Sequence, residues 1–388
     1  MACDDDGVSL LELTIAMALT LALTASVFAI VRDGWRAFST EPQTADMQQR
    51  LRVAVGGIAR DLVMAGAGPS AGGQSAPLVY TFPPVLPFRQ GAVADDPPGT
   101  FRTDTVTVIY VPATIAQTTL RVDLAPGAQT LDVVPQANCP SAAALCGFAS
   151  GMTILVYEQT GNFDTFTVAA VEGASSQIAI APRPQDALTT TYKAGANVVE
   201  AQLHTYYVKI DPVTQIAQLM HYDGSANAGV PVVDHLVGLR FDYYGEPRPP
   251  ALTPSGATYG PAPPLIGVSL PGYSAGENCV FAADADTGLQ FPRLPVLGAG
   301  DALTTLTAAQ LTDGPWCPDA VNANRWDADL LRIRTVVVTA RVESALASLR
   351  GPAGALFANP GTSTGGSMWA PDIEISLQVT PRNMSVSR

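Results

Sequence analysis

The stretch that decides the fold is Gly7-Val8-Ser9-Leu10-Leu11-Glu12-Leu13-Thr14-Ile15-Ala16, which opens an apolar run that lasts to Val31. From Leu13 onward the run has roughly 19 residues, about 28 Å of α-helix at 1.5 Å per residue, which is close to the thickness of a bilayer's hydrocarbon core. The carboxylate of Glu12 lies near the start of the run, where an unpaired charge is costly and usually functional. The sequence therefore predicts a membrane helix that carries one functional carboxylate.

These residues resemble the class III signal of type IV pilins and of type II secretion pseudopilins. The family's usual wording is close to Gly-Phe-Thr-Leu-Ile-Glu-Leu, and this chain has Gly-Val-Ser-Leu-Leu-Glu-Leu at 7–13. The resemblance implies that a prepilin peptidase cuts after Gly7 and that the new N-terminal residue, Val8, is N-methylated. It also implies that Glu12 pairs with the amine of Val8 in the same or a neighbouring subunit.

The charge of the leader and the type of signal both bear on this resemblance. The leader, Met1 to Asp6, is acidic, whereas the leaders of the family are basic. The alternatives to a pilin-like segment are an ordinary signal anchor and a secretory signal peptide. A secretory signal should have a basic n-region and small residues at its end, and this chain has only the second feature, near Ala25-Ser26-Val27. The pilin-like interpretation therefore fits best.

The helical pattern continues beyond Val31, so we expect one long N-terminal helix with a membrane half and an amphipathic half. Pro42 is expected to kink or briefly interrupt it, and Gly66, Gly68 and Pro69 to end it. Apolar residues at spacings of three and four mark the face that packs on the rest of the protein. They are Met47, Leu51, Val55, Ile58, Leu62 and Ala65.

The remainder of the chain is rich in turn residues and poor in charge. It has 34 glycines and 32 prolines, and 14% of its residues are charged, which favours a loop-rich β domain outside the cytoplasm over a helical enzyme. The net charge of −13 argues against nucleic acid as a partner. Polar and apolar alternation predicts strands at 105–111, 120–124, 130–134, 153–157, 163–171, 178–181, 198–210, 215–222, 236–244, 330–341 and 373–379.

Later motifs narrow the resemblance to the larger minor pilins of the PilW type. The motifs are Arg60-Asp61-Leu62 running into glycine, a Tyr206-Tyr207-Val208 hairpin that turns at Asp211-Pro212, the aromatic strand end Leu239–Tyr244, and Pro381-Arg382-Asn383 near the end. The resemblance implies an α+β, type IV pilin-like fold, in which a long N-terminal helix packs on a β-rich head. The expected parts are a cleaved leader (1–7), a transmembrane and assembly helix (8–31), its amphipathic continuation (32–66), a linker loop (67–103), the head (104–244), a Pro/Gly-rich insertion (245–328) and closing strands (329–388).

The cysteines predict disulfides. Cys3 lies in the leader, and the other four form an even set in a chain expected outside the cytoplasm, where disulfides persist. The sequence allows three pairings, and we favour the local scheme of Cys139 with Cys146 and Cys279 with Cys317. The second pair would staple the insertion. A metal site at these residues is disfavoured, because neither pair has C-x-x-C spacing and no histidine lies nearby.

No motif predicts an enzyme, a metal or a cofactor. His204, His221 and His235 have no carboxylate or cysteine at ligand spacing, so we expect ordinary surface or core roles for them. The G-x-S-x-G match at 361–365 lacks the strand and helix of a nucleophile elbow and predicts a loop. The Asp-Ala-Asp-Thr-Gly run at 284–288 hints at calcium but lacks the following acidic ligand, which leaves a calcium-stabilised loop as the weaker alternative.

The resemblance implies a minor pilin that enters a type IV pilus at or near its tip and helps to prime assembly. Such a protein is anchored in the inner membrane with its head in the periplasm, and then moves into the surface pilus. The implied partners are the prepilin peptidase, other minor pilins, the major pilin and a tip adhesin. Two alternatives stay open. One is a J-type minor pseudopilin of a type II secretion system, whose heads are usually much smaller, and the other is an adhesin or receptor that acts through residues 245–328.

Overall fold

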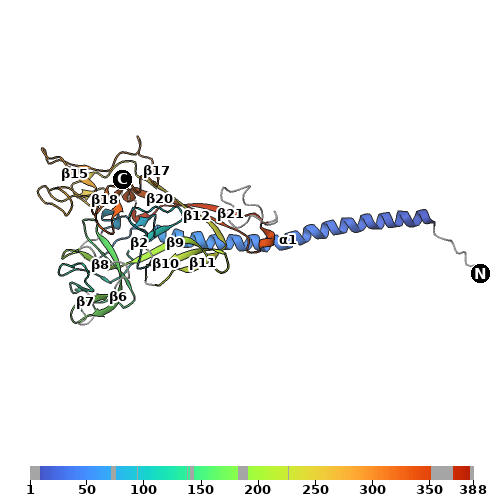
Figure 1. Ribbon diagram of the computed structural model, residues 1–388, viewed down its shortest axis with the longest axis horizontal. Coiled ribbons are helices and arrows are strands. Elements are labelled where there is room, and N and C mark those ends of the chain that lie inside the picture. The colour runs from blue at the N-terminus through green and yellow to red at the C-terminus, as the bar shows by residue number, and fades with distance from the viewer. Residues whose placement is uncertain are drawn as a thin grey trace, which may run out of the picture. The chain divides into compact units, whose positions relative to one another are not determined.

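The computed structural model has one long N-terminal α-helix, α1, followed by a β-rich head with two disulfides, an α+β arrangement (Figure 1). It divides into two compact units, Met1–Arg50 with Val342–Ile373 and Leu51–Arg341 with Glu374–Arg388. The structure describes residues 9–70, 76–93, 95–137, 139, 144–181, 191–225, 227–350 and 370–384.

Helix α1 runs from Leu10 to Met64 and is not interrupted at Pro42, where we expected a kink or a brief interruption. Pro42 has no N–H and therefore removes one backbone hydrogen bond of α1. The helix continues because the φ angle of a proline fits a helix. The helix stops before Gly66, whose φ of 80° is left-handed and whose N–H donates to the carbonyl of Ile109 at 3.1 Å. Glycine commonly ends helices in this way because it has no Cβ to clash.

The second half of α1 is amphipathic, as predicted. The apolar residues at spacings of three and four are buried, whereas Arg52, Val53 and Arg60 between them are exposed. One buried stripe on an otherwise exposed helix is the pattern that packing on a single side produces. The stripe consists of Met47, Leu51, Val55, Ile58, Leu62 and, just beyond the helix, Ala65.

In the first unit, polar contacts hold the segment around the 3₁₀-helix η3 (Ala347–Leu349) to α1. The hydroxyl of Ser344 donates to the side-chain oxygen of Gln43 at 3.1 Å. The guanidinium of Arg350 pairs with the carboxylate of Glu343 at 3.2 Å, and both side chains are largely buried. Each charge in this buried pair has the opposite charge beside it, because a buried charge without a partner is strongly destabilising.

A five-stranded antiparallel sheet of the second unit has the order β1-β2-β9-β10-β11. Strands β9 and β10 form the predicted hairpin, with Tyr206 opposite His221. The edge strand β11 was not predicted, because only Val233 of its five residues is buried and no apolar alternation marks it. The strands are β1 (Val85–Leu86), β2 (Val106–Tyr110), β9 (Gln202–Ile210), β10 (Ala217–Tyr222) and β11 (Val230–Asp234).

A six-stranded antiparallel sheet has the order β3-β8-β5-β6-β7-β4. Its apolar core includes one buried residue from each of five strands, namely Leu131, Ile154, Phe166, Ile178 and Val198. The strands are β3 (Gln117–Thr119), β4 (Thr130–Asp132), β5 (Thr153–Tyr157), β6 (Phe163–Glu172), β7 (Gln177–Ile180) and β8 (Asn197–Glu200).

Three predicted strands differ from the observed ones. The run 198–210 is split between β8 and β9, which belong to different sheets, and a strand-like pattern that continues across Ala201 does not reveal a change of sheet. The run 120–124 makes only isolated bridges. The run 330–341 begins as a strand at Ile333, because the 3₁₀-helix η2 (Ala328–Arg332) precedes it.

A third sheet has the order β17-β12-β20-β21, and the insertion 245–328 adds three two-stranded antiparallel ribbons. The insertion therefore consists mainly of loops joined by short ribbons, as its Pro/Gly content suggests. The remaining elements are η1 (Leu78–Tyr80), β12 (Leu236–Gly245), β13 (Leu252–Thr253), β14 (Gly256–Ala257), β15 (Phe281–Ala283), β16 (Gln290–Pro292), β17 (Thr304–Leu306), β18 (Trp316–Cys317), β19 (Trp326–Asp327), β20 (Ile333–Val342), β21 (Ile373–Val379) and η6 (Arg382–Met384).

Candidate functional site

The first part of α1 is an apolar surface that the described chain leaves uncovered. The span Leu10–Arg32 has 23 residues, none of its most apolar window is buried, and by length and composition it can cross a membrane. Large apolar side chains are exposed along it rather than gathered on one stripe, which is typical of a helix surrounded by lipid or by other helices. They include Leu11, Ile15, Leu19, Leu23, Phe28 and Ile30.

Ser9 and Glu12 cap the start of α1. The carboxylate of Glu12 accepts a hydrogen bond from the backbone N–H of Ser9 at 3.0 Å, and the Ser9 hydroxyl oxygen accepts one from the N–H of Leu11 at 3.3 Å. This reciprocal arrangement is a capping box. The role of Ser9 was not predicted, although S-x-x-E before an apolar run signals a capping box. Gly7 and Val8 lie outside the described residues, so cleavage, methylation and the amine pair stay predictions.

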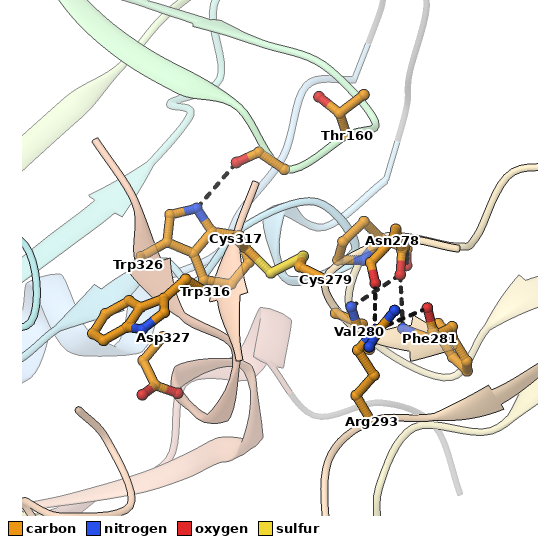
Figure 2. The surroundings of a disulfide bond; sticks show 12 residues. Thr160, Asn278, Cys279, Val280, Phe281, Arg293, Trp316, Cys317, Trp326 and Asp327 are labelled. Atoms are coloured by element: carbon orange, nitrogen blue, oxygen red, sulfur yellow. Dashed lines mark hydrogen bonds between the residues drawn. A yellow bond between two sulfur atoms is a disulfide. The ribbon is translucent and has the colours of Figure 1, made fainter. Parts of the chain in front are cut away.

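Both favoured disulfides are present: Cys139 is bonded to Cys146, and Cys279 to Cys317. Cys279 lies just before β15 and Cys317 ends β18, and both are completely buried. Figure 2 shows the second disulfide between these two segments, with Trp326 beside it. The bond therefore joins two ribbons of the insertion, as predicted.

Buried hydrogen bonds fix the surroundings of the second disulfide. The side-chain oxygen of Asn278 accepts from the N–H groups of Val280 and Phe281 at 2.9 and 2.7 Å, as Figure 2 shows. The indole N–H of Trp326 donates to the carbonyl of Gly161 at 3.0 Å, which links the insertion to the six-stranded sheet's β5–β6 turn. Satisfied buried polar groups of this kind make a rigid base for the outer loops.

The outer loops of the insertion expose large apolar side chains. The side-chain amide of Gln290, in β16, donates to the carbonyls of Pro264 and Gly276 at 2.8 and 2.7 Å, so the loop 264–268 is tied to the β15–β16 hairpin. Contiguous exposed apolar groups on a surface often mark an interaction site. The exposed residues here are Leu265, Ile266, Val268, Leu289 and Phe291.

Two of the three histidines meet a carboxylate inside the second unit. Ring nitrogens Nδ1 of His204 and Nε2 of His221 lie 2.8 Å apart, and Oδ2 of Asp61 is 3.9 Å from the same His204 nitrogen. The hydroxyl of Tyr206 donates to Asp61 Oδ2 at 2.6 Å, and the hydroxyl oxygen of Tyr110 lies 3.3 Å from Nε2 of His204. Asp61 is not at ligand spacing from these histidines in the sequence, because it comes from α1, far earlier in the chain.

Strand geometry explains why these groups meet. His204 and Tyr206 are two residues apart on β9 and so point to the same face, and His221 lies opposite Tyr206 on β10. Burial lowers the pKa of His204, and so does His221, while the carboxylates of Asp61 and Asp223 raise it. Burial raises the pKa of Tyr206, and the hydrogen bond to Asp61 raises it further. A His204 imidazole and a Tyr206 phenol that both favour their neutral forms therefore lie beside the Asp61 carboxyl group.

A second buried cluster contains Asp327 and Asp329. The Asp327 carboxylate accepts from the N–H groups of Gly314 and Asp329 at 2.6 and 2.9 Å, and Asp329 pairs with the buried guanidinium of Arg332. Burial raises the pKa of Asp327 to about 7 and that of Asp329 to about 6, the latter against the opposing effect of Arg332. These contacts give the cluster a structural role, capping η2 and fixing β19.

Two weaker motifs have different outcomes. Oδ1 of Asp284 accepts from the N–H groups of Asp286 and Thr287 and from the Thr287 hydroxyl, at 3.1, 2.8 and 2.8 Å, so this carboxylate caps the turn between β15 and β16. The weaker alternative of calcium at 284–288 stays a prediction. The G-x-S-x-G match at 361–365 lies outside the described residues. His235 precedes β12 with a φ of 60° and is not part of the His204–His221 cluster.

A scan against protein-family models gives no match to this chain, and searches of curated proteins and of solved structures match none either. The function therefore has to be inferred from the residues themselves. Their two strongest features are the uncovered apolar span with Glu12 at its start and the buried Asp61–His204–His221 group.

Proposed function

We propose that this protein is a minor pilin, a subunit that enters a type IV pilus through its N-terminal helix and helps to prime assembly at or near the tip. The observation that carries the proposal is the Gly-Val-Ser-Leu-Leu-Glu-Leu sequence at 7–13 in front of an apolar span whose side chains are uncovered. The prepilin peptidase, other minor pilins, the major pilin and a tip adhesin are its proposed partners.

The uncovered span supports this proposal through the hydrophobic effect. An exposed run of large apolar side chains is stable only when lipid or other apolar helices surround it. In the inner membrane, lipid covers the span, and in a filament the same span packs against those of neighbouring subunits. One segment thus serves as membrane anchor before assembly and as core of the fibre afterwards.

Glu12 supports the proposal through its charge. Cleavage after Gly7 creates an amine at Val8, four residues before the carboxylate. An ammonium group of a neighbouring subunit would neutralise Glu12 inside the apolar core, and only the correct stagger between helices brings the two together. The capping box uses one oxygen of Glu12, which leaves the other for this pair.

The decisive experiment is the N-terminal peptide mass of the protein recovered from membranes and from sheared surface material. We expect a peptide that starts at methylated Val8 and disappears when Gly7 is substituted. A chain that still starts at Met1 would leave only a signal anchor. A start between Ile30 and Asp33 would mean a cleaved, secreted protein and would refute the proposal.

A matched pair of variants separates the charge of Glu12 from its cap. Glu12→Gln keeps the capping box, because glutamine also accepts the Ser9 N–H, but it removes the charge. We expect this variant to be processed normally yet to be strongly depleted from sheared filaments. Equal incorporation of Glu12→Gln and wild type would show that the cap alone matters. Processed protein that never reaches sheared material in the wild type would instead favour the type II secretion alternative.

The exposed apolar residues of the insertion favour a second candidate function, adhesion by the mature pilus. Substituting Leu265 and Phe291 by serine removes apolar surface at positions where both side chains are at least half exposed. We expect filaments to assemble as in the wild type while attachment of cells falls. Unchanged attachment would count against an adhesive role for this surface.

A further inference from the structure

We infer that Asp61, His204 and His221 form a binding site for a divalent transition metal ion, with Zn²⁺ as the best fit. The site is independent of the proposed function, since it lies wholly within the second unit and involves no residue of the apolar span. It joins the last turn of α1 to the hairpin of β9 and β10.

The three potential ligand atoms lie close to one another. One carboxylate oxygen and one nitrogen of each imidazole lie within 4.8 Å of one another. Ligand atoms about 2.05 Å from a tetrahedral Zn²⁺ ion are separated by about 3.3 Å. The observed separations of 2.8 Å between the histidine nitrogens and 3.9 Å between His204 and Asp61 lie on either side of that value. To bind one ion, the two ring nitrogens have to move apart by about half an ångström and turn toward the ion, and the carboxylate oxygen has to move closer to His204.

The protonation chemistry also permits binding. The 2.8 Å contact between the two imidazoles is a hydrogen bond that uses one N–H and one lone pair. Both nitrogens become ligands when the bridging proton moves, through solvent, to the other nitrogen of the same ring, and no net proton is lost. His204 then carries its proton on Nε2, where the hydroxyl oxygen of Tyr110 lies 3.3 Å away as an acceptor.

Outer contacts hold two of the ligands in place. The Tyr206 hydroxyl donates to Asp61 Oδ2 at 2.6 Å and fixes the carboxylate, and the Tyr110 hydroxyl fixes the His204 ring. Hydrogen bonds of this kind to metal ligands set ring orientation and commonly contribute 10- to 100-fold in affinity. The side chains of Asp61 and His204 keep 12% and 15% exposure, so an ion can enter and water can complete the coordination.

The ligand types select the metal. Two imidazoles and one carboxylate suit Zn²⁺ and its first-row neighbours, whereas Ca²⁺ and Mg²⁺ require oxygen ligands. The surrounding charges favour a cation, since Asp223 adds a second carboxylate that acts on His204, whereas Arg60, whose positive charge acts on Tyr206, has an exposed side chain. Three protein ligands with water in a fourth position give a site that can fix α1 to the sheet.

The test uses the untagged full chain, purified in mild detergent with its disulfides intact and stripped with a chelator. Calorimetry with ZnCl₂ should show one site per chain with a dissociation constant in the micromolar range or tighter. A site that loses one of its three protein ligands loses most of its affinity for the ion. His204→Gln and His221→Gln should therefore each weaken Zn²⁺ binding at least 100-fold. Tyr206→Phe should weaken it about 10-fold through the lost outer contact.

His235→Asn is the matched control, because it removes the third histidine, which lies outside the cluster, and asparagine tolerates the left-handed backbone there. It should bind Zn²⁺ as the wild type does. X-ray absorption at the zinc edge on the wild type keeps the test decisive if a ligand variant fails to fold, and it should show two imidazoles and oxygen. No saturable binding below 100 µM, an equal loss in His235→Asn, or a zinc shell without imidazole would overturn the inference.

Discussion

Raising the pH from 5 to 7 should lower the free energy of unfolding of the head, because Asp327 loses its proton. Its side chain is 1% exposed and accepts hydrogen bonds from the N–H groups of Gly314 and Asp329. Burial raises the pKa of Asp327 from 3.8 to about 7, and the carboxylates of Asp329 and Asp313 add to the rise, while the two N–H donors oppose it. Between these pKa values the folded chain holds a proton that the unfolded chain has lost.

The sign and the size of this change in stability follow from the linkage between proton binding and folding. Because the folded pKa is the higher one, the stabilisation is complete below the unfolded pKa and is lost as the pH rises through the folded pKa. A carboxyl group that titrates near 4 when unfolded and near 7 when folded loses about 2 kcal/mol of stability between pH 5 and pH 7. Above pH 8 the contribution should level off.

The assay compares the wild type with Asp327→Asn, whose amide does not titrate. Urea unfolding of the full chain in detergent, followed by tryptophan fluorescence, reports on the buried Trp326 next to Asp327. The free energy of unfolding of the wild type minus that of the variant should fall by about 2 kcal/mol from pH 5 to pH 7. A difference that does not change with pH would refute the reasoning, because the carboxylate would then be charged throughout despite its burial.

Asp284→Asn provides a control of opposite sign. Hydrogen bonds from the N–H and hydroxyl of Thr287 and the N–H of Asp286 lower the pKa of the Asp284 carboxyl group. Its stabilisation is therefore present above the unfolded pKa and is lost as the pH falls through the folded pKa. The difference between wild type and Asp284→Asn should be flat from pH 5 to pH 7 and should shrink only at more acidic pH.

Two further predictions concern contacts that hold the head together. The first is a double-mutant cycle of Asp61→Asn and Tyr206→Phe, measured by urea unfolding in the presence of a chelator. The coupling energy should be about 2 kcal/mol, as for a buried hydrogen bond to a charged group. A coupling energy near zero would contradict the 2.6 Å contact. Replacing Cys279 and Cys317 by alanine should lower the free energy of unfolding by about 4 kcal/mol, and replacing Cys139 and Cys146 should lower it by about 2 kcal/mol. The difference arises because the first disulfide closes a loop of 38 residues and the second a loop of 7. Equal losses would argue against the chain-entropy account.

Local patterns predicted the long helix and most of the longer strands, because the spacing of apolar residues follows which side chains are buried. The stripe on α1 was visible since every third or fourth residue packs inward, and the hairpin of β9 and β10 was visible from its alternation and its turn at Asp211-Pro212. Strand β11 has one buried residue and gave no such signal. The split between β8 and β9 was also invisible, because a single residue, Ala201, separates the two strands and both have strand-like sequences.

The candidate metal site was missed for a different reason. Ligand spacing in a sequence reveals sites whose ligands share one helix, strand or loop, whereas Asp61 reaches the histidines only after α1 packs on the sheet. A local signal nevertheless existed. Asp61 lies three residues after Ile58 and next to Leu62, so it is a carboxylate beside the buried stripe.

A carboxylate in that position needs a partner, because burying an unpaired charge costs several kcal/mol. Lysine or arginine on the facing strands would have satisfied it, but those strands present Tyr110, His204, Tyr206 and His221. Two imidazoles joined by a hydrogen bond balance a carboxylate poorly by themselves, and in the proposed site a cation between the three side chains balances it well. The composition of the facing strands, read together with Asp61, therefore points to a metal ion and not to a salt bridge as the group that offsets the buried charge.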